Sequence, residues 1–265
     1  MTVYADVLRY RELFLNLFRR DFQAKYKGSL LGIVWSLLNP LALLAVYLVV
    51  FGLIWTGQKI PHYPLYLLAG LSCWIFLSTS IQAAARSLID SGDLIKKVRF
   101  PRQLVPLATV AAQSVSFVVM LGILIAISLV LVPGGRATVW LSIPLAALFA
   151  CLVAGLALVV ACVNVLFRDV EHIITAGLLP WFFLTPILWR FAELPARVQR
   201  HHFLLWVLRW VNPVAPSVEA VRDAVWLGRA PRLADVVYLA VAAVVALVLG
   251  AVVFRAVDDR LAAEL

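Results

Sequence analysis

The sequence predicts an all-α integral membrane protein with six transmembrane helices. An amphipathic interfacial helix precedes them, and short re-entrant helices are expected in the outer loop before the last span. Apolar residues make up 64% of the 265 positions and charged residues only 14%, against roughly 45–50% and about 25% in soluble domains. Long uncharged apolar runs recur along the chain, and basic residues concentrate in alternate connections between them.

The first 30 residues are expected to form the interfacial helix. Aromatic residues recur there every four positions and so share one helix face: Tyr10, Phe14, Phe18, Phe22 and Tyr26. The opposite face is rich in arginine, as in a helix that lies in the membrane interface. Simple anchoring and contact with a cytoplasmic partner both remain open. Residues 31–265 are expected to form the six-helix bundle of a single domain, 1–265.

Six uncharged runs meet or approach the roughly 20 apolar residues that a membrane-spanning helix needs. These runs are Gly32–Gln58, Leu65–Ala85, Gln103–Gly135, Ala137–Phe167, Ile173–Trp189 and Val236–Phe254. The fifth is short and contains Pro180 and Pro186, so we expect a broken or tilted helix. The apolar stretch Phe203–Leu208 is too short to cross and is expected to be re-entrant or interfacial.

Basic residues predict the orientation of these spans. They cluster before the first run and after the second, which the positive-inside bias assigns to the cytoplasm together with both termini. The first apolar run is too long for the core of a typical signal peptide. The connection from Arg190 to Arg232 carries seven arginines, although this topology places it outside. Either the fifth run does not cross, or, as we prefer, this loop is basic for a functional reason.

Cysteine, histidine and net charge argue against several other classes of protein. Cys73, Cys151 and Cys162 lie inside apolar runs, as small hydrophobic residues do. None of the four histidines lies in the middle of a span, which disfavours a histidine-based catalytic or proton-relay centre within the membrane. The formal charge of +9 follows the topology, so nucleic acid is not an expected partner.

Several short motifs occur in a fixed order along almost the whole chain. They are Lys25-Tyr-Lys-Gly-Ser-Leu-Leu-Gly-Ile-Val-Trp35 with Asn39-Pro40 and Val50-Phe51-Gly52, then Phe100-Pro101-Arg102, Asn164-Val-Leu-Phe-Arg168-Asp169-Val, Thr185-Pro186-Ile-Leu-Trp189, Asn212-Pro213 and Val221-Arg222-Asp223. Each motif is weak by itself, but their order and spacing together are specific. In these motifs the chain resembles the ABC-type permeases that export lipid-linked polysaccharides, such as O-antigen, teichoic-acid and capsule exporters.

The resemblance implies a half-transporter in a bacterial plasma membrane. Such permeases form homodimers, pair with two copies of a separate ATP-hydrolysing subunit, and carry a lipid-linked polysaccharide through the membrane. The sequence contains no G-x-x-x-x-G-K-[ST] phosphate loop, which agrees with this expectation. We therefore expect no cofactor on this chain and Mg-ATP on the partner subunit.

The cytoplasmic connection after the second span is the expected docking element for the ATPase. Ser91 or Asp93 is expected to cap a short helix and Pro101 to end it, with an apolar face for a partner. A solvated basic loop is the alternative. The full set of expected coupling residues is Asp90, Asp93, Leu94, Ile95, Val98, Arg99, Phe100, Pro101, Arg102, Arg168 and Asp169. Arg168 and Asp169 belong to a polar cluster with Glu171 and His172. This cluster is a poor metal site, because side chains at adjacent helical positions diverge and cannot converge on one ion.

Aromatic and arginine residues indicate where a glycan would pass. Aromatic rings can pack on the apolar faces of sugars, and the candidates are Trp35, Tyr47, Trp181, Phe182, Phe183 and Trp189. Packing against lipid or other helices is the alternative for each. In the outer loop, we expect arginines to meet an anionic group of the cargo or lipid headgroups: Arg190, Arg197, Arg200, Arg209 and Arg222.

Three other readings stay open on the sequence. An ABC permease for a drug or lipid would have a similar fold. A membrane-embedded glycan-modifying enzyme would need acid–base groups gathered at one face, for which only the Arg168–His172 cluster and the His201-His202 pair qualify. A simple channel would need a filter or a ring of acidic residues, which the sequence does not suggest.

Overall fold

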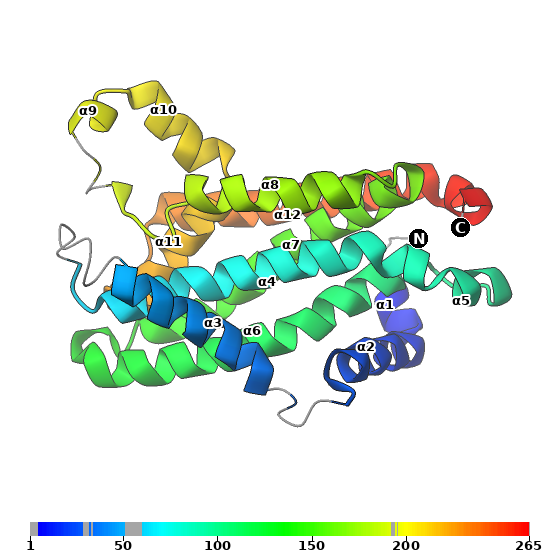
Figure 1. Ribbon diagram of the computed structural model, residues 1–265, viewed down its shortest axis with the longest axis horizontal. Helices are drawn as coiled ribbons and strands as arrows, with labels where there is room; N and C mark the ends of the chain where they lie inside the picture. Colours follow the sequence, from blue (N-terminus) through cyan, green and yellow to red (C-terminus); the bar gives the residue numbers. More distant parts are fainter. Residues whose placement is uncertain are drawn as a thin grey trace.

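The computed structural model describes residues 5–28, 32, 34–50, 60–191, 194 and 196–264, and this part of the chain contains helices and no strand. Helices α1 and α2 precede the bundle, α5 is a short connection after α4, and α9 to α11 lie before the last helix (Figure 1). The helices are α1 (Ala5–Arg9), α2 (Arg11–Tyr26), α3 (Val34–Tyr47), α4 (Tyr63–Asp90), α5 (Gly92–Lys97), α6 (Leu104–Leu131), η2 (Pro133–Gly135), η3 (Val139–Leu141), α7 (Ser142–Leu166), α8 (Val170–Leu184), α9 (Ala196–Gln199), α10 (His202–Trp206), the π-helical η5 (Val207–Val211), α11 (Val214–Val225) and α12 (Leu233–Glu264).

Among the described residues, four helices are long and apolar enough to cross a membrane. They coincide with the second, third, fourth and sixth predicted spans: Tyr63–Asp90, Leu104–Leu131, Val139–Leu166 and Leu233–Asp258. Shorter apolar helices fall in the first and fifth predicted spans, at Leu38–Val50 and Val170–Leu184. Residues 51–59 of the first predicted span lie outside the described part. The 15-residue α8 continues through Pro180 and ends before Pro186, so it is short but not broken at its internal proline.

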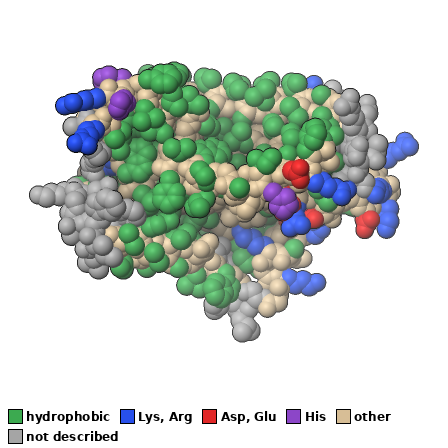
Figure 2. Space-filling model, turned by 45° about the horizontal axis from the view of Figure 1, so that its top comes forward, with side chains coloured by type: hydrophobic (Ala, Val, Ile, Leu, Met, Phe, Trp, Pro, Cys, Tyr) green, Lys and Arg blue, Asp and Glu red, His purple; other side chains and the backbone are tan. Residues whose placement is uncertain are grey.

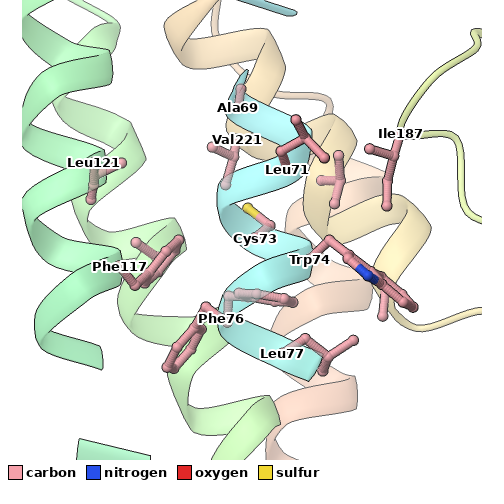
Figure 3. Close-up of a cluster of buried hydrophobic side chains, with 14 of the residues drawn as sticks. Ala69, Leu71, Cys73, Trp74, Phe76, Leu77, Phe117, Leu121, Ile187 and Val221 are labelled. Carbon is pink, nitrogen blue, oxygen red and sulfur yellow. The ribbon is translucent and has the colours of Figure 1, made fainter. Parts of the chain in front are cut away.

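Helix α4 is the centre of the bundle. It packs against α3, α6, α7, α8 and α11, and its side chains are buried on all sides over much of its length. Figure 3 shows Cys73, Trp74, Phe76 and Leu77 of this helix between neighbouring elements, with Phe117 on one side. The rings of Phe76 and Phe117 stack with centroids 4.7 Å apart. A helix that is apolar all round in this way belongs in the interior of a bundle.

Helices α7 and α12 approach each other closely at two glycines. A Cβ atom on Gly155 would lie 2.3 Å from the backbone carbon of Ala246, and one on Gly250 would lie 2.8 Å from the backbone oxygen of Gly155. Small residues allow membrane helices to pack backbone against backbone, where dispersion and close packing replace the hydrophobic effect. This contact attaches the last helix to the bundle.

The amino-terminal helices α1 and α2 dock on the protein. Leu17 is buried, and Tyr10, Phe14 and Phe18 pack against a core of α4, α6, α7 and α12 residues. The predicted aromatic stripe is therefore present, but about half of it covers protein.

A row of hydrogen bonds, here called the polar seam, joins α1 and α2 to α6. Gln103 donates to Asp6 at 2.7 Å and Thr109 donates to Asp21 at 2.6 Å. Lys25 donates to Gln113 at 2.7 Å and to Ser116 at 3.0 Å, and the hydroxyls of Tyr26 and Ser116 lie 3.1 Å apart. Gln103 lies just before α6, and the three α6 residues Thr109, Gln113 and Ser116 lie at helical spacing, so they form one polar stripe on a mostly apolar helix.

The two ends of the bundle differ in character. Figure 1 shows α1, α5 and the carboxyl-terminal end of α12 at one end, here the α5 end, and α9, α10 and α11 at the other, here the α11 end. On the face shown in Figure 2, Lys and Arg side chains gather mostly toward the two ends, and hydrophobic side chains cover most of the middle. An apolar band between charged ends is the surface that a bilayer requires.

We predict that Gly155→Ala lowers the thermal stability of the protein, because the added methyl group forces α7 and α12 apart. Overpacking of this kind costs about 1–3 kcal/mol. Thermal unfolding in detergent would measure it. Gly122→Ala on α6 is the matched control, since a Cβ there meets nothing within 4 Å. Equal melting temperatures for the two variants would contradict the prediction.

Candidate functional sites at the two ends of the bundle

The α5 segment lies at the α5 end as a short helix between α4 and α6. Ser91 occupies the N-cap position without a side-chain capping bond, and its hydroxyl instead accepts a hydrogen bond from Arg20 of α2 at 3.1 Å. The helix ends at Lys97, so the expectation that Pro101 ends it was wrong. The segment is thus tied to the amino-terminal helix as well as to its neighbours in sequence.

The apolar face expected on α5 is smaller than predicted. Ile95 is buried among α4, α6 and α7 residues, and Leu94 packs against the same core. Val98 remains 49% exposed just after the helix. Around it, Phe100 and Pro101 are half-buried, whereas the charged residues of the segment are exposed: Asp90, Asp93, Lys96, Lys97 and Arg99. Only Val98 offers an apolar contact for another chain, since the other two residues hold α5 in place.

Arg102 links the α5 segment to the end of α12. Its guanidinium donates to the Asp258 carboxylate at 3.1 Å and also to the backbone oxygen of the same residue. Arg102 is about one-fifth exposed and Asp258 half exposed. A displacement of the segment would therefore be transmitted directly to the last helix.

The turn between α7 and α8 is at the same end, and a buried asparagine fixes it. Asn164 donates to the backbone oxygen of Ala85 at 2.8 Å and accepts from the backbone nitrogen of Glu171 at 2.9 Å. Glu171 also lies 3.4 Å from Arg86. The predicted coupling residues Arg168 and Asp169 are exposed at the tip of the turn. Among the described residues, no three His, Cys, Asp or Glu side chains gather as metal ligands.

Most of the predicted pathway aromatics come together between α3, α4 and α8. Tyr47 stacks on Phe182 with centroids 6.0 Å apart, and Trp74 lies 5.8 Å from Trp181 and 5.5 Å from Phe182. Trp74 was not among the predicted residues. Phe183 is 54% exposed, and the Trp189 indole donates to its backbone oxygen at 3.0 Å. Trp35 is 58% exposed and lies apart, beside a cavity near α2 and α6.

Arg222 is at the centre of the α11 end, and we call its surroundings the arginine node. It is 1% exposed, so the structure corrects the expectation that it presents charge at the surface of the outer loop. Its Nε donates to the backbone oxygen of Tyr66 at 3.2 Å and its Nη2 to that of Ile187 at 2.7 Å. Its Nη1 donates to the Tyr66 hydroxyl at 2.9 Å and to the Pro186 backbone oxygen. A side chain at Gly70 would collide with this guanidinium, because a Cβ there lies 2.2 Å from Nη2.

Two tyrosines of α4 complete the arginine node. The Tyr66 hydroxyl donates to the backbone oxygen of Trp189 at 2.6 Å, and the Tyr63 hydroxyl donates to that of Leu188 at 3.3 Å. The non-helical stretch after α8 thereby has its carbonyl groups bonded from residue 186 to residue 189. Each backbone group left without a hydrogen bond in a membrane interior costs roughly several kcal/mol of free energy. The node therefore allows the chain to leave the helix at this depth.

The remaining outer arginines divide into paired and exposed ones. Arg209 lies 2.8 Å from the buried Asp235, and Arg229 lies 2.7 Å from the buried Asp223. Arg190 lies over the Trp226 ring at 4.9 Å. Arg197 and Arg200 are exposed. Part of the positive charge of this connection is thus neutralised by carboxylates within the protein. A count of its arginines alone does not reveal this.

Sequence analysis missed Tyr66, Gly70 and the polar stripe of α6. The stripe has a detectable signal, since Thr109, Gln113 and Ser116 recur at intervals that fit one helix face. Tyr66 and Gly70 are one turn apart on α4, but nothing local indicates that an arginine 156 positions from Tyr66 reaches them.

These features define a multi-pass integral membrane protein built as a helical bundle. The chain belongs to the ABC-2 type transporter family, because the model of that family matches residues 12–226. It is 30% identical to the O-antigen export system permease protein RfbA of Myxococcus xanthus over 260 residues, 97% of this chain and 96% of that protein. A protein of the same name from Klebsiella pneumoniae is 30% identical over 80% of this chain and 79% of its own length. The polysialic acid transport protein KpsM of Escherichia coli is 25% identical over 92% of this chain and 93% of its own.

We predict that Arg222→Met destabilises the protein strongly, since it leaves the Ile187 carbonyl group without its donor and removes one of the two donors to that of Pro186, which also accepts from the Tyr66 hydroxyl. Each unpaired buried group costs about 1–3 kcal/mol. Limited proteolysis in detergent, followed between α8 and α11, would report the loosened segment. Arg200→Met is the matched control, because Arg200 is exposed. The same cleavage rate in both variants would contradict the structural role of the arginine node.

Proposed function

We propose that this chain is the transmembrane half of an ATP-driven exporter that moves a lipid-linked polysaccharide to the outer face of the plasma membrane. The observation that carries the proposal is the match to three named glycan-export permeases over most of their length and of this chain. O-antigen, teichoic acid or a similar glycan is the class of cargo. The working unit is a homodimer of this chain with two copies of an ATPase subunit, on which Mg-ATP binds.

We further propose that the chain crosses the bilayer six times with both termini in the cytoplasm. The first crossing uses α3. In the fifth, the 15 residues of α8 rise about 22 Å at about 1.5 Å per residue, and the bonded stretch up to Trp189 continues toward the α11 end. Exposed Lys96, Lys97 and Arg99 at the α5 end support a cytoplasmic position for α5.

The α5 segment and the α7–α8 turn are the proposed docking surface for the ATPase. Both lie at the α5 end, and both are anchored: α5 through Ile95 and Arg102, the turn through Asn164. Rigid anchoring suits an element that transmits closure of the ATPase to the helices. Val98, Arg99, Arg168 and Asp169 are the exposed residues that would meet the partner.

The aromatic cluster of Tyr47, Trp181 and Phe182 supports a path for a sugar chain. Tyr47 and Trp181 are partly exposed, whereas Phe182 is buried and packs against Tyr47. The exposed parts of the rings are flat and apolar, so successive sugars can slide past them. Exposed Arg197 and Arg200 at the α11 end supply positive charge to an anionic group of the cargo as it leaves.

The export proposal is tested by deleting the gene in its native host and measuring where the glycan accumulates. We expect lipid-linked glycan to build up at the cytoplasmic face and to disappear from the cell surface. Restoring the gene should reverse both effects. Surface glycan that persists at the normal level in the deletion strain would refute the proposed cargo.

Gentle affinity purification from the native membrane tests the partner separately. We expect a nucleotide-binding ATPase to co-purify at equal stoichiometry with this chain. A stable complex that contains no ATPase would overturn the half-transporter, whatever the deletion strain shows.

We predict that Val98→Asp reduces export at least about tenfold while the amount of protein in the membrane stays normal. The physical reason is that a carboxylate removes the only exposed apolar contact of the α5 segment. Val98→Ile is the conservative control and should retain export. Ile95→Asp should instead lower protein abundance, because Ile95 is buried. Normal export by Val98→Asp at normal abundance would exclude this residue from coupling.

A further inference from the structure

A crevice runs between α2 and the pair α4 and α6. It consists of two cavities of about 350 and 520 Å³. Lys25 and Gln113 line both cavities, so the two adjoin at this hydrogen-bonded pair. One half lies toward the α5 end, and the other lies deeper, where α3 also contributes to the wall. Figure 1 shows α2 and α3 beside α6, on the side away from α12.

Charged side chains line the half toward the α5 end, with three basic residues against two acidic ones. Its wall includes Arg20, Lys25 and Arg86 with the carboxylates of Asp21 and Asp90. Arg20 pairs with Asp21 at 2.8 Å, and Arg86 is 3.4 Å from Glu171. These partners partly neutralise the two arginines.

Lys25 differs from the two arginines, and it stands where the halves meet. Its ammonium donates to the neutral oxygens of Gln113 and Ser116, and none of the ion pairs between described residues includes it. An ammonium has three donors, and two of them are directed to these side chains. Lys25 is exposed and its ammonium lies 5.5 Å from the centre of the Tyr26 ring, which leaves its third donor for an anion that enters the crevice.

The deeper half of the crevice is mostly apolar. Large side chains of three helices enclose it: Trp35, Pro40, Ile75, Phe76, Phe117 and Met120. A few small polar groups, such as those of Ser72 and Thr79, lie among them. An apolar chamber directly behind an uncompensated cation fits a molecule with an anionic head and a hydrocarbon tail.

We propose that this crevice binds the phosphorylated end of the lipid that carries the glycan. This inference rests on the proposed export function and names where the carrier is held before transport. The diphosphate accepts charge-assisted hydrogen bonds from Lys25, and the first part of the hydrocarbon chain lies against Phe76, Phe117 and Met120. The crevice is distinct from the aromatic cluster of Tyr47, Trp181 and Phe182, so the lipid and the sugar chain occupy different surfaces.

The experiment is equilibrium binding of radiolabelled farnesyl diphosphate to the full-length chain in phosphatidylcholine nanodiscs. We expect saturable binding that Lys25→Gln weakens at least about tenfold, because a charged hydrogen bond is lost. Glutamine can still donate to Gln113 and Ser116, so α2 stays docked. Lys27→Gln is the matched control: Lys27 is exposed two positions further on and does not line the crevice.

A second pair of variants tests the apolar half. Ile75→Trp fills the chamber and should weaken binding at least about tenfold, whereas Ile89→Trp on an exposed position of the same helix should not. Farnesol and inorganic pyrophosphate should each compete poorly, since each offers one half of the ligand. Melting temperatures of all four variants establish that they fold.

Three results would overturn the proposal: no saturable binding, equal affinity of wild type and Lys25→Gln, or loss of binding when phosphatidylglycerol replaces phosphatidylcholine. The last result would assign the crevice to ordinary anionic lipid instead of the carrier. None of these results bears on export itself, which the deletion strain tests independently. If the deletion strain retains surface glycan, the export function fails even where farnesyl diphosphate binds.

Discussion

The architecture depends on one requirement: buried backbone groups that leave a helix must find partners within the protein. After α8 the chain is no longer helical from Pro186 to Trp189, next to the buried core. Arg222 of α11 and the tyrosines of α4 donate to the carbonyl groups of this stretch. A guanidinium suits the role because it carries five donors in one plane and stays charged. The burial of Arg222 is thus a consequence of how α8 ends, and Gly70 is small because the guanidinium occupies that space.

The same residues explain a charge distribution that otherwise conflicts with the topology. Seven arginines between positions 190 and 232 would favour a cytoplasmic loop. However, Arg209 and Arg229 lie against the buried carboxylates of Asp235 and Asp223, and Arg222 satisfies backbone oxygens. Arg222 is buried and Arg209 is about one-fifth exposed, so these two are structural cations, whereas the paired Arg229 is half exposed. Only a smaller set, including Arg197 and Arg200, is exposed and able to meet headgroups or cargo.

Local patterns in the sequence predicted the elements well and the contacts between them poorly. Apolar run length located α4, α6, α7 and α12, since each of these helices must match the bilayer by itself. The prolines predicted the short α8 for the same local reason. In contrast, the burial of Ile95 and of Arg222 depends on residues that lie far away in the chain. The polar stripe of α6 was visible as a spacing, but its partners Asp6, Asp21 and Lys25 are known only once α2 is placed beside it.

The polar seam also has a consequence for the order in which the protein is made. Lys25 precedes Gln113 by 88 positions and Ser116 by 91. At about 5–20 residues per second, the ribosome completes α2 roughly 4–18 s before the part of α6 that will hold it. During that interval α2 has no polar partner on α6, and its aromatic face has only the membrane surface to cover it. An amphipathic helix is suited to this delay, because it can bind the bilayer surface first. Its aromatic face can then replace contacts with lipid by contacts with protein without leaving the interface.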